Sequence, residues 1–130
     1  MNTPISLEIA KLLKEKGFDN IECDGYYHVC DGYTKGYAHC YSEVNTQRED
    51  AILAPTIAEV VMWLYEKHEI WIEVSCHTVL DEKDDDIDVD VFYSIIRELK
   101  PVNVLYSGDF VNSPTEAYEA AIIYTLKNLI

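Results

Sequence analysis

Hydrophobic residues recur at helical spacing in three segments of the chain. The first follows Thr3, which we place at the helix cap, and stops at Gly17, a residue that readily adopts the left-handed conformation at a helix end. The second covers about residues 55–68 and the third about residues 114–129. Thr56 and Ser113 each stand three positions before a glutamate, the capping-box arrangement that marks a helix start. The pattern therefore predicts three helices.

Alternating hydrophobic and polar residues between these segments predict strands. Turn signals at Asp24-Gly25 and Asp31-Gly32 indicate a hairpin in which residues 26–29 pair with residues 37–43. After the second helix, residues 70–74 alternate as a half-buried strand does. A second strand is expected to turn Ile87, Val89, Val91 and Tyr93 inward, and residues 102–106 are expected to form a third.

The predicted element order is α-β-β-α-β-β-β-α. Because short connections between successive strands favour antiparallel pairing, we expect an α+β fold. It would contain one antiparallel sheet of about five strands, with three helices packed mainly on one face. At 130 residues and 48% hydrophobic content, residues 1–130 are expected to form a single globular domain.

Targeting signals are missing from the sequence. No apolar run approaches the roughly 20 residues that a membrane span needs, and the first residues lack the basic and apolar regions of a secretory signal. The sequence therefore predicts a cytoplasmic protein, with thiols in place of disulfides.

The strong negative charge of the chain favours some classes of binding partner over others. Twenty-four acidic residues against ten basic ones give a net charge of −14, which disfavours direct binding to nucleic acid or to an anionic membrane and favours a basic partner. The carboxylates are densest in one turn and the strand after it: Asp84, Asp85, Asp86, Asp88 and Asp90. A calcium loop is disfavoured, because Val89 stands at the glycine position and Ile95 at the glutamate position. The plainer interpretation is that the acidity confers solubility.

Tyrosines gather in the predicted hairpin. Tyr26, Tyr27, Tyr33 and Tyr37 could form an exposed aromatic patch, and tyrosine is favoured at protein interfaces because it joins a large apolar area to a polar tip. In the alternative interpretation they cover the core. The five aspartates and these four tyrosines are our candidate interaction residues.

Cysteine and histidine residues also cluster there. The candidate metal ligands are Cys23, His28, Cys30, His39 and Cys40. Zinc binds such ligands in a tetrahedron, but structural sites usually use tight C-x(2–4)-C knuckles, and this hairpin has none. Cysteines that serve as small core residues are the alternative. A Cys30–His39 pair across the hairpin is a conceivable nucleophile and base, yet no catalytic motif occurs, so we assign no catalytic residue and no cofactor.

Three segments carry a resemblance to a known family. SLEIAKLLKEKGF (6–18), APTIAEVVMWLYEKH (54–68) and SPTEAYEAA (113–121) resemble a small protein family of phages and integrated mobile elements of Bacteroidetes. The resemblance covers the first helix and most of the chain after residue 54. The resemblance implies a phage or prophage context and the cytoplasm of a bacterial host, and it supplies no activity, ligand or catalytic residue.

Two functions follow as hypotheses. The first is a non-enzymatic phage or mobile-element accessory protein that binds a host or phage protein, in its sharpest version as an acidic DNA mimic. The alternative is a small metal-binding or ligand-binding domain that uses the Cys/His-rich hairpin 23–40. A homodimer is compatible with either function, through an unpaired sheet edge or the Trp63/Trp71 region.

Overall fold

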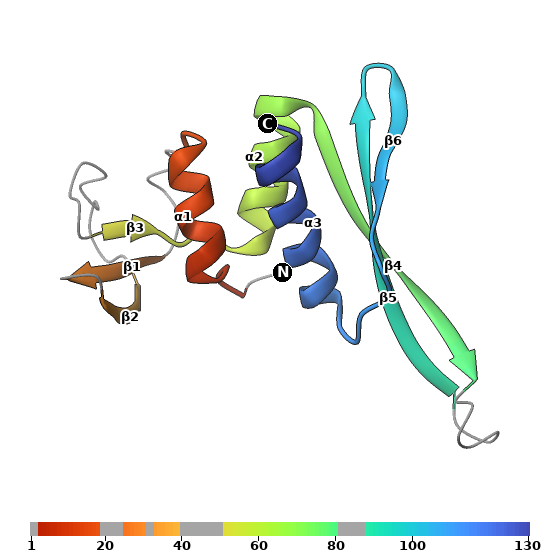
Figure 1. The fold of residues 1–130 in the computed structure, drawn as a ribbon, viewed down its shortest axis with the longest axis horizontal. Helices are drawn as coiled ribbons and strands as arrows, with labels where there is room; N and C mark the ends of the chain where they lie inside the picture. Colours follow the sequence, from red (N-terminus) through yellow and green to blue (C-terminus); the bar gives the residue numbers. More distant parts are fainter. Residues whose placement is uncertain (1–2, 19–24, 31–32, 40–50, 81–87) are drawn as a thin grey trace.

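The computed structural model describes residues 3–18, 25–30, 33–39, 51–80 and 88–130 (Figure 1). Its helices are α1 (Leu7–Glu15), α2 (Ile57–His68) and α3 (Pro114–Asn128). Its strands are β1 (Gly25–Cys30), β2 (Tyr33–His39), β3 (Ala51–Leu53), β4 (Ile70–Leu80), β5 (Asp88–Leu99) and β6 (Val102–Ser107). The predicted α+β class and antiparallel pairing are confirmed.

The described strands form two sheets instead of the predicted single sheet of about five strands. One sheet has the order β2-β1-β3 and the other β4-β5-β6. Helix α1 packs on β3, whereas α2 and α3 pack on β4, and α3 also on β5. The helices therefore lie between the two sheets, as Figure 1 shows. The sequence did not predict β3, because three residues are too few to show a period.

Helix α1 begins at a different residue from the one predicted. Its cap is Ser6, whose hydroxyl accepts the Ile9 N–H at 3.4 Å. Thr3, expected to be the cap, instead accepts the Ile57 N–H on its backbone carbonyl at 3.2 Å, and the Ile5 N–H donates to the Pro55 carbonyl at 3.0 Å. This backbone pairing with the start of α2 holds the segment extended until Ser6. The predicted stop is confirmed, because Gly17 has a φ of 85°.

The two predicted capping sites are confirmed, with one difference. At α2, Thr56 accepts the Glu59 N–H at 3.3 Å, and the Glu59 carboxylate accepts the Thr56 N–H at 3.1 Å, which completes the capping box. At α3, Ser113 accepts the Glu116 N–H at 3.2 Å. The Glu116 carboxylate there accepts the N–H of Asn112, one residue before the cap.

The core lies where the three helices meet one another and the inner face of the β4–β6 sheet. Its fully buried side chains are Ile5, Ile9, Leu13, Ile57, Val60, Leu64, Ile72, Ile96, Ile122 and Leu126. The buried hydroxyl of Thr125 donates to the Ala121 carbonyl at 2.8 Å, so this polar group is satisfied inside the core. Among the described helices, none is both long enough and apolar enough to cross a bilayer.

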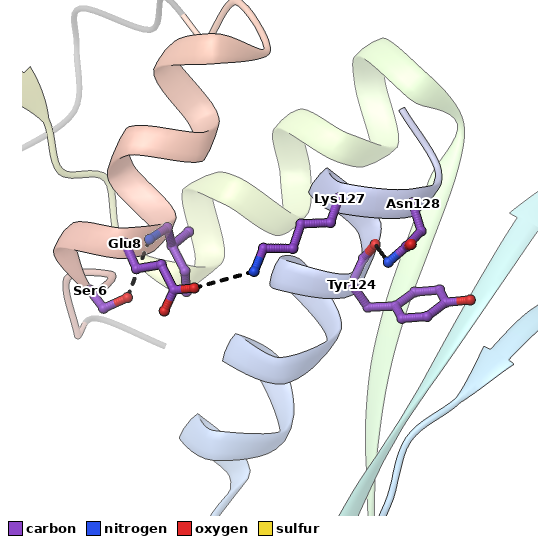
Figure 2. A network of polar contacts seen from close by, with 6 residues as sticks. Ser6, Glu8, Tyr124, Lys127 and Asn128 are labelled. Atoms are coloured by element: carbon purple, nitrogen blue, oxygen red, sulfur yellow. Dashed lines mark hydrogen bonds and ion pairs between the residues drawn. The ribbon is translucent and has the colours of Figure 1, made fainter.

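Polar and aromatic contacts join α3 to its neighbours. Figure 2 shows Lys127 of α3 reaching the Glu8 carboxylate of α1, at 3.5 Å. On the other side of α3, the ring of Tyr124 stacks on that of Tyr106 from β6, with centroids 3.8 Å apart. Because both members of the ion pair are exposed, it adds little to stability. The stacked rings and the buried apolar contacts are what hold α3 to the sheet.

Candidate functional site

The two faces of the β4–β6 sheet follow from the strand register. Ile72 pairs with Ile96, and their exposed fractions of 1% and 0% identify the face that the helices cover. Successive side chains on a strand point to opposite faces. The next pairs along, Glu73 with Ile95 and Trp71 with Arg97, therefore lie on the opposite face, although the Trp71 ring still meets the Tyr65 ring of α2 edge to face at 5.8 Å. In Figure 1 the helices lie mainly to one side of this sheet.

We call this second face the outer face. It is mostly apolar: by register and contact it carries Trp71, Val91, Tyr93, Ile95, Leu99, Val102, Val104 and Phe110. Val102 is 73% exposed, Val104 53% and Phe110 62%. Large exposed apolar residues that gather on one face indicate an interaction surface, whereas singly scattered ones do not.

An aromatic group closes one end of the outer face. The Phe110 ring lies 5.6 Å from the Tyr93 ring in an edge-to-face arrangement and 6.1 Å from the His77 ring in a stacked one. Two backbone hydrogen bonds between Phe92 and Val111, of 2.9 and 2.8 Å, place Phe110 beside β5. The backbone pairing of Val111 with Phe92 therefore holds the Phe110 ring on the outer face, against Tyr93 and His77.

Charged side chains on the outer face neutralise each other. Arg97 and Glu73, on neighbouring strands, form an ion pair. Near the end of the sheet where β4 begins, Lys100 and Glu69 form a second pair, 3.1 Å between nitrogen and oxygen. The described part of this face thus has balanced charge, although the chain as a whole carries −14.

Strands β4 and β5 continue past the helices as a two-stranded arm, at the lower right of Figure 1. Cys76, His77 and Thr78 on this arm are exposed, and so is Asp90. The Thr78 hydroxyl donates to the Asp90 carboxylate across the strands at 2.9 Å. The arm therefore presents polar side chains away from the core, with an acidic residue held in place by its neighbour.

The predicted interaction residues fall in different parts of the molecule. Asp88 is the first residue of β5 and Asp90 lies two residues further on the arm, whereas Asp84, Asp85 and Asp86 lie outside the described residues. Tyr26 is on β1, and Tyr33 and Tyr37 are on β2. The β1–β2 hairpin and the acidic arm belong to different sheets. The structure therefore does not bring the two predicted sets together on one sheet.

Tyr27 faces the interior. Its side chain is partly buried against the core, and its hydroxyl donates to the Ile5 carbonyl at 2.6 Å. This placement corresponds to the alternative in which the hairpin tyrosines cover the core. Burial raises the pKa of Tyr27, and the negative charge of Glu119 on α3 raises it further. The pKa of Glu119 is itself raised, first by burial and then by the Glu116 carboxylate.

Because the pKa of Glu119 is raised, we expect the free energy of unfolding to depend on pH through this residue. The folded chain holds the proton of the Glu119 carboxyl more tightly than the unfolded chain does. The contribution of this group to the free energy of unfolding is therefore fully present below the ordinary pKa of 4.5, and it is lost as the pH rises through the raised pKa. Glu119→Gln removes the ionisation. It is expected to raise the free energy of unfolding near pH 7 and to change it little near pH 4.

Urea unfolding of both proteins at the two pH values measures this difference. Glu66→Gln, which removes an exposed carboxylate from α2, is the control for the loss of one charge. A gain from Glu119→Gln that is equal at both pH values would contradict the assignment.

The candidate metal ligands are only partly placed. Cys23 and Cys40 lie outside the described residues. In the β1–β2 register His39 pairs with Gly25, whereas Cys30 pairs with Tyr33 next to the turn. Cys30 and His39 therefore lie at opposite ends of the hairpin, which excludes them as directly paired nucleophile and base. No group of three potential ligands is found among the side chains that the structure describes. The metal-binding alternative stays a prediction.

An open hollow of about 500 Å³ lies between the end of α3 and the β4–β6 sheet. Its lining is His68, Ile70, Glu98, Leu105, Leu129 and Ile130. The His68 ring meets the ring of Trp63 edge to face, at 4.9 Å. One imidazole and one carboxylate in an aliphatic setting define no reaction class by themselves.

Comparison with protein-family models, with curated proteins and with solved structures gives no match for this chain. Its site must therefore be judged from its own geometry.

The outer face was not predicted from the sequence. We expected Ile87, Val89, Val91 and Tyr93 to point inward. Ile87 lies outside the described residues, whereas Val89, Val91 and Tyr93 lie on the outer face by register, and the buried residues of β5 are Ser94 and Ile96. A signal was present. Adjacent apolar pairs, Phe92-Tyr93 and Ile95-Ile96, are typical of a strand that is apolar on both faces.

Proposed function

We propose that this chain is a non-enzymatic accessory protein of a phage or mobile element, and that it binds a host or phage protein through the β4–β5 arm. The observation that carries the proposal is the arm itself. It extends past the helices (Figure 1), and Cys76, His77, Thr78 and Asp90 are exposed on it. A projecting two-stranded element with exposed polar groups suits contact with another protein better than it suits catalysis.

Charge supports a basic partner. The segment that joins β4 to β5, residues 81–87, contributes five carboxylates and one lysine to the sequence, and Asp88 and Asp90 follow it. Carboxylates in such number attract a cationic surface and speed its association. In its sharper form the proposal makes the arm an acidic DNA mimic, in which Asp84, Asp85, Asp86, Asp88 and Asp90 stand for phosphates and occupy a DNA-binding protein.

The proposal predicts that two conservative substitutions on the arm weaken partner binding. In Asp88→Asn/Asp90→Asn two charges are lost, while an amide oxygen at position 90 can still accept the Thr78 hydrogen bond. Because encounter with a basic partner depends on the summed charge at the contact, the variant is expected to recover several-fold less partner.

The measurement is a parallel affinity purification, with co-purifying proteins quantified by mass spectrometry. The matched control is Glu15→Gln/Glu66→Gln, which removes the same charge from exposed positions on α1 and α2. Equal loss in the arm variant and in the control would show that net charge alone attracts the partner. Equal recovery of the partner by all three proteins would contradict a role for the arm.

A further inference from the structure

We propose that two copies of this chain associate through the outer face of the β4–β6 sheet. The outer face meets the arm at His77 and Val91, but the polar pair of the arm, Thr78 and Asp90, lies on the opposite face by register, so the proposal does not depend on the proposed function. The occupant is a second copy, and it would meet the same patch across a two-fold axis, as symmetric dimers do.

The outer face is apolar, and its backbone is rigid. Val102, Val104 and Phe110 are each more than half exposed, and they lie on or beside one edge of a hydrogen-bonded sheet. Phe110 is fixed by its ring contacts with Tyr93 and His77. Burying such residues gains free energy in proportion to the apolar area removed from water. Little of that gain is spent on ordering, because the backbone is already rigid.

The paired charges of the outer face favour a second copy of this chain over a basic partner. A cationic protein gains nothing from a face whose Glu73 is already paired with Arg97 and whose nearby Glu69 is paired with Lys100. Two chains of −14 repel each other in general. They can approach closely only where the facing surfaces carry no net charge, and the outer face is such a surface.

Strand β6, at the edge of its sheet, lacks most of the features that protect an edge from pairing. Its sequence VNVLYS contains no charged residue, no proline and no glycine. Edge strands of monomeric proteins are usually protected from pairing by charges, prolines or bulges. Here one bulge interrupts the pairing with β5 next to Val104, the partner of Arg97, and both Val102 and Val104 remain exposed. An edge of this kind fits a position inside an assembly.

The three-stranded part of the outer face sets the strength of the contact. Strand β6 pairs with β5 over five positions. With a rise of about 3.3 Å per residue and three strands about 4.8 Å apart, this part measures roughly 240 Å² in plan. A specific interface removes about 800 Å² of accessible surface from each partner. Because the plan area is smaller than that, we expect the dimer to be weak and to form only as the concentration rises.

The test is the mass in solution, measured by sedimentation equilibrium over a range of concentrations. The wild-type chain is expected to approach twice its mass of 14.9 kDa as concentration rises. The association should persist or strengthen in about 0.5 M salt, because salt screens the repulsion between acidic chains. Val104→Glu and Phe110→Glu are each expected to shift the equilibrium at least tenfold toward monomer.

The matched control is Met62→Glu. Met62 is a large apolar residue that is 44% exposed on α2 and not part of the β4–β6 sheet, and the substitution adds the same single charge. This variant is expected to dimerise as the wild-type chain does. A wild-type chain that stays monomeric at every concentration would overturn the proposal. So would a dimer that Val104→Glu and Phe110→Glu leave intact.

A second measurement needs no variant. Hydrogen exchange of the wild-type chain at low and at high concentration should show slower exchange at β6 and the outer rim as the dimer forms. Unchanged exchange there, with a dimer present, would place the contact elsewhere and overturn the proposal. The arm variant Asp88→Asn/Asp90→Asn should still dimerise, so failure of the arm hypothesis and failure of the dimer hypothesis are distinguishable.

Discussion

Replacing Leu126 by alanine is expected to lower the free energy of unfolding by about 3 kcal/mol. Leu126 is fully buried on α3, the helix that contacts α1, α2 and the β4–β6 sheet. Deleting its branched end removes apolar contacts inside the core cluster and leaves a cavity that the packed neighbours close only in part. Because a domain of this size is stabilised by only about 5–15 kcal/mol, the loss is a large share of the total.

Urea unfolding followed by tryptophan fluorescence measures this effect, since Trp63 is 8% exposed and reports on the core. Met62→Ala is the control: it also shortens a large helical side chain, but one that is 44% exposed. It is expected to change the free energy of unfolding by no more than about 0.5 kcal/mol. Similar losses in both variants would contradict the assignment of Leu126 to the centre of the core.

Replacing Gly108 by alanine is expected to cost about 2 kcal/mol of stability. A β-carbon at position 108 would lie 2.6 Å from the hydroxyl oxygen of Ser94, closer than two such atoms can approach. Ser94 is only 2% exposed, and its carbonyl accepts the Gly108 N–H at 2.9 Å. Gly108 directly follows β6, and its backbone cannot move away from β5 without weakening that hydrogen bond. Because the Ser94 side chain is buried, its hydroxyl has little room to turn aside, so the added methyl group is crowded.

A double-mutant cycle isolates this contact. In a Ser94→Ala background the clashing oxygen is gone, and the other atoms near the added carbon are 3.7 Å or further away. Gly108→Ala should then cost at least about 1 kcal/mol less than in the wild-type chain. Equal costs in both backgrounds would show that the close approach to Ser94 is not the cause.

Local signals predicted the parts of the fold that depend on neighbours in the sequence. Thr56 and Ser113 were identified as caps because the cap and its amide lie within one helical turn. The predicted hairpin exists, but β2 begins at Tyr33, directly after the Asp31-Gly32 turn signal, so Tyr27 pairs with Tyr37. The strand boundary there was misplaced because residues 33–36 mix strand and turn formers.

Features that depend on distant contacts were not predictable from these signals. The cap of α1 moved from Thr3 to Ser6 because residues 3–5 pair with the start of α2, some fifty positions away. The division into two sheets depends on where the helices pack, which strand periodicity does not encode. For the candidate site, the acidic residues were read directly from the sequence. The outer face became visible only once the register showed which β5 residues the helices cover.

The two surfaces proposed for this chain have different physical characters. The β4–β5 arm is acidic at its described end and projects away from the core, whereas the outer face is apolar and has internally paired charges. Salt should therefore affect them in opposite ways. It weakens attraction between the arm and a basic protein, and it relieves repulsion between two copies of the chain.

The most direct test of the central claim, that the acidic arm binds a basic protein, is the salt dependence of co-purification. The tagged chain is expressed in a Bacteroidetes host, and its retained partners are quantified at about 0.1 M and about 0.5 M salt. If the arm binds a basic protein, we expect one stoichiometric partner with a basic surface, which is retained at low salt and largely lost at high salt. Failure to retain a partner at either salt, or a partner held equally at both, would contradict it.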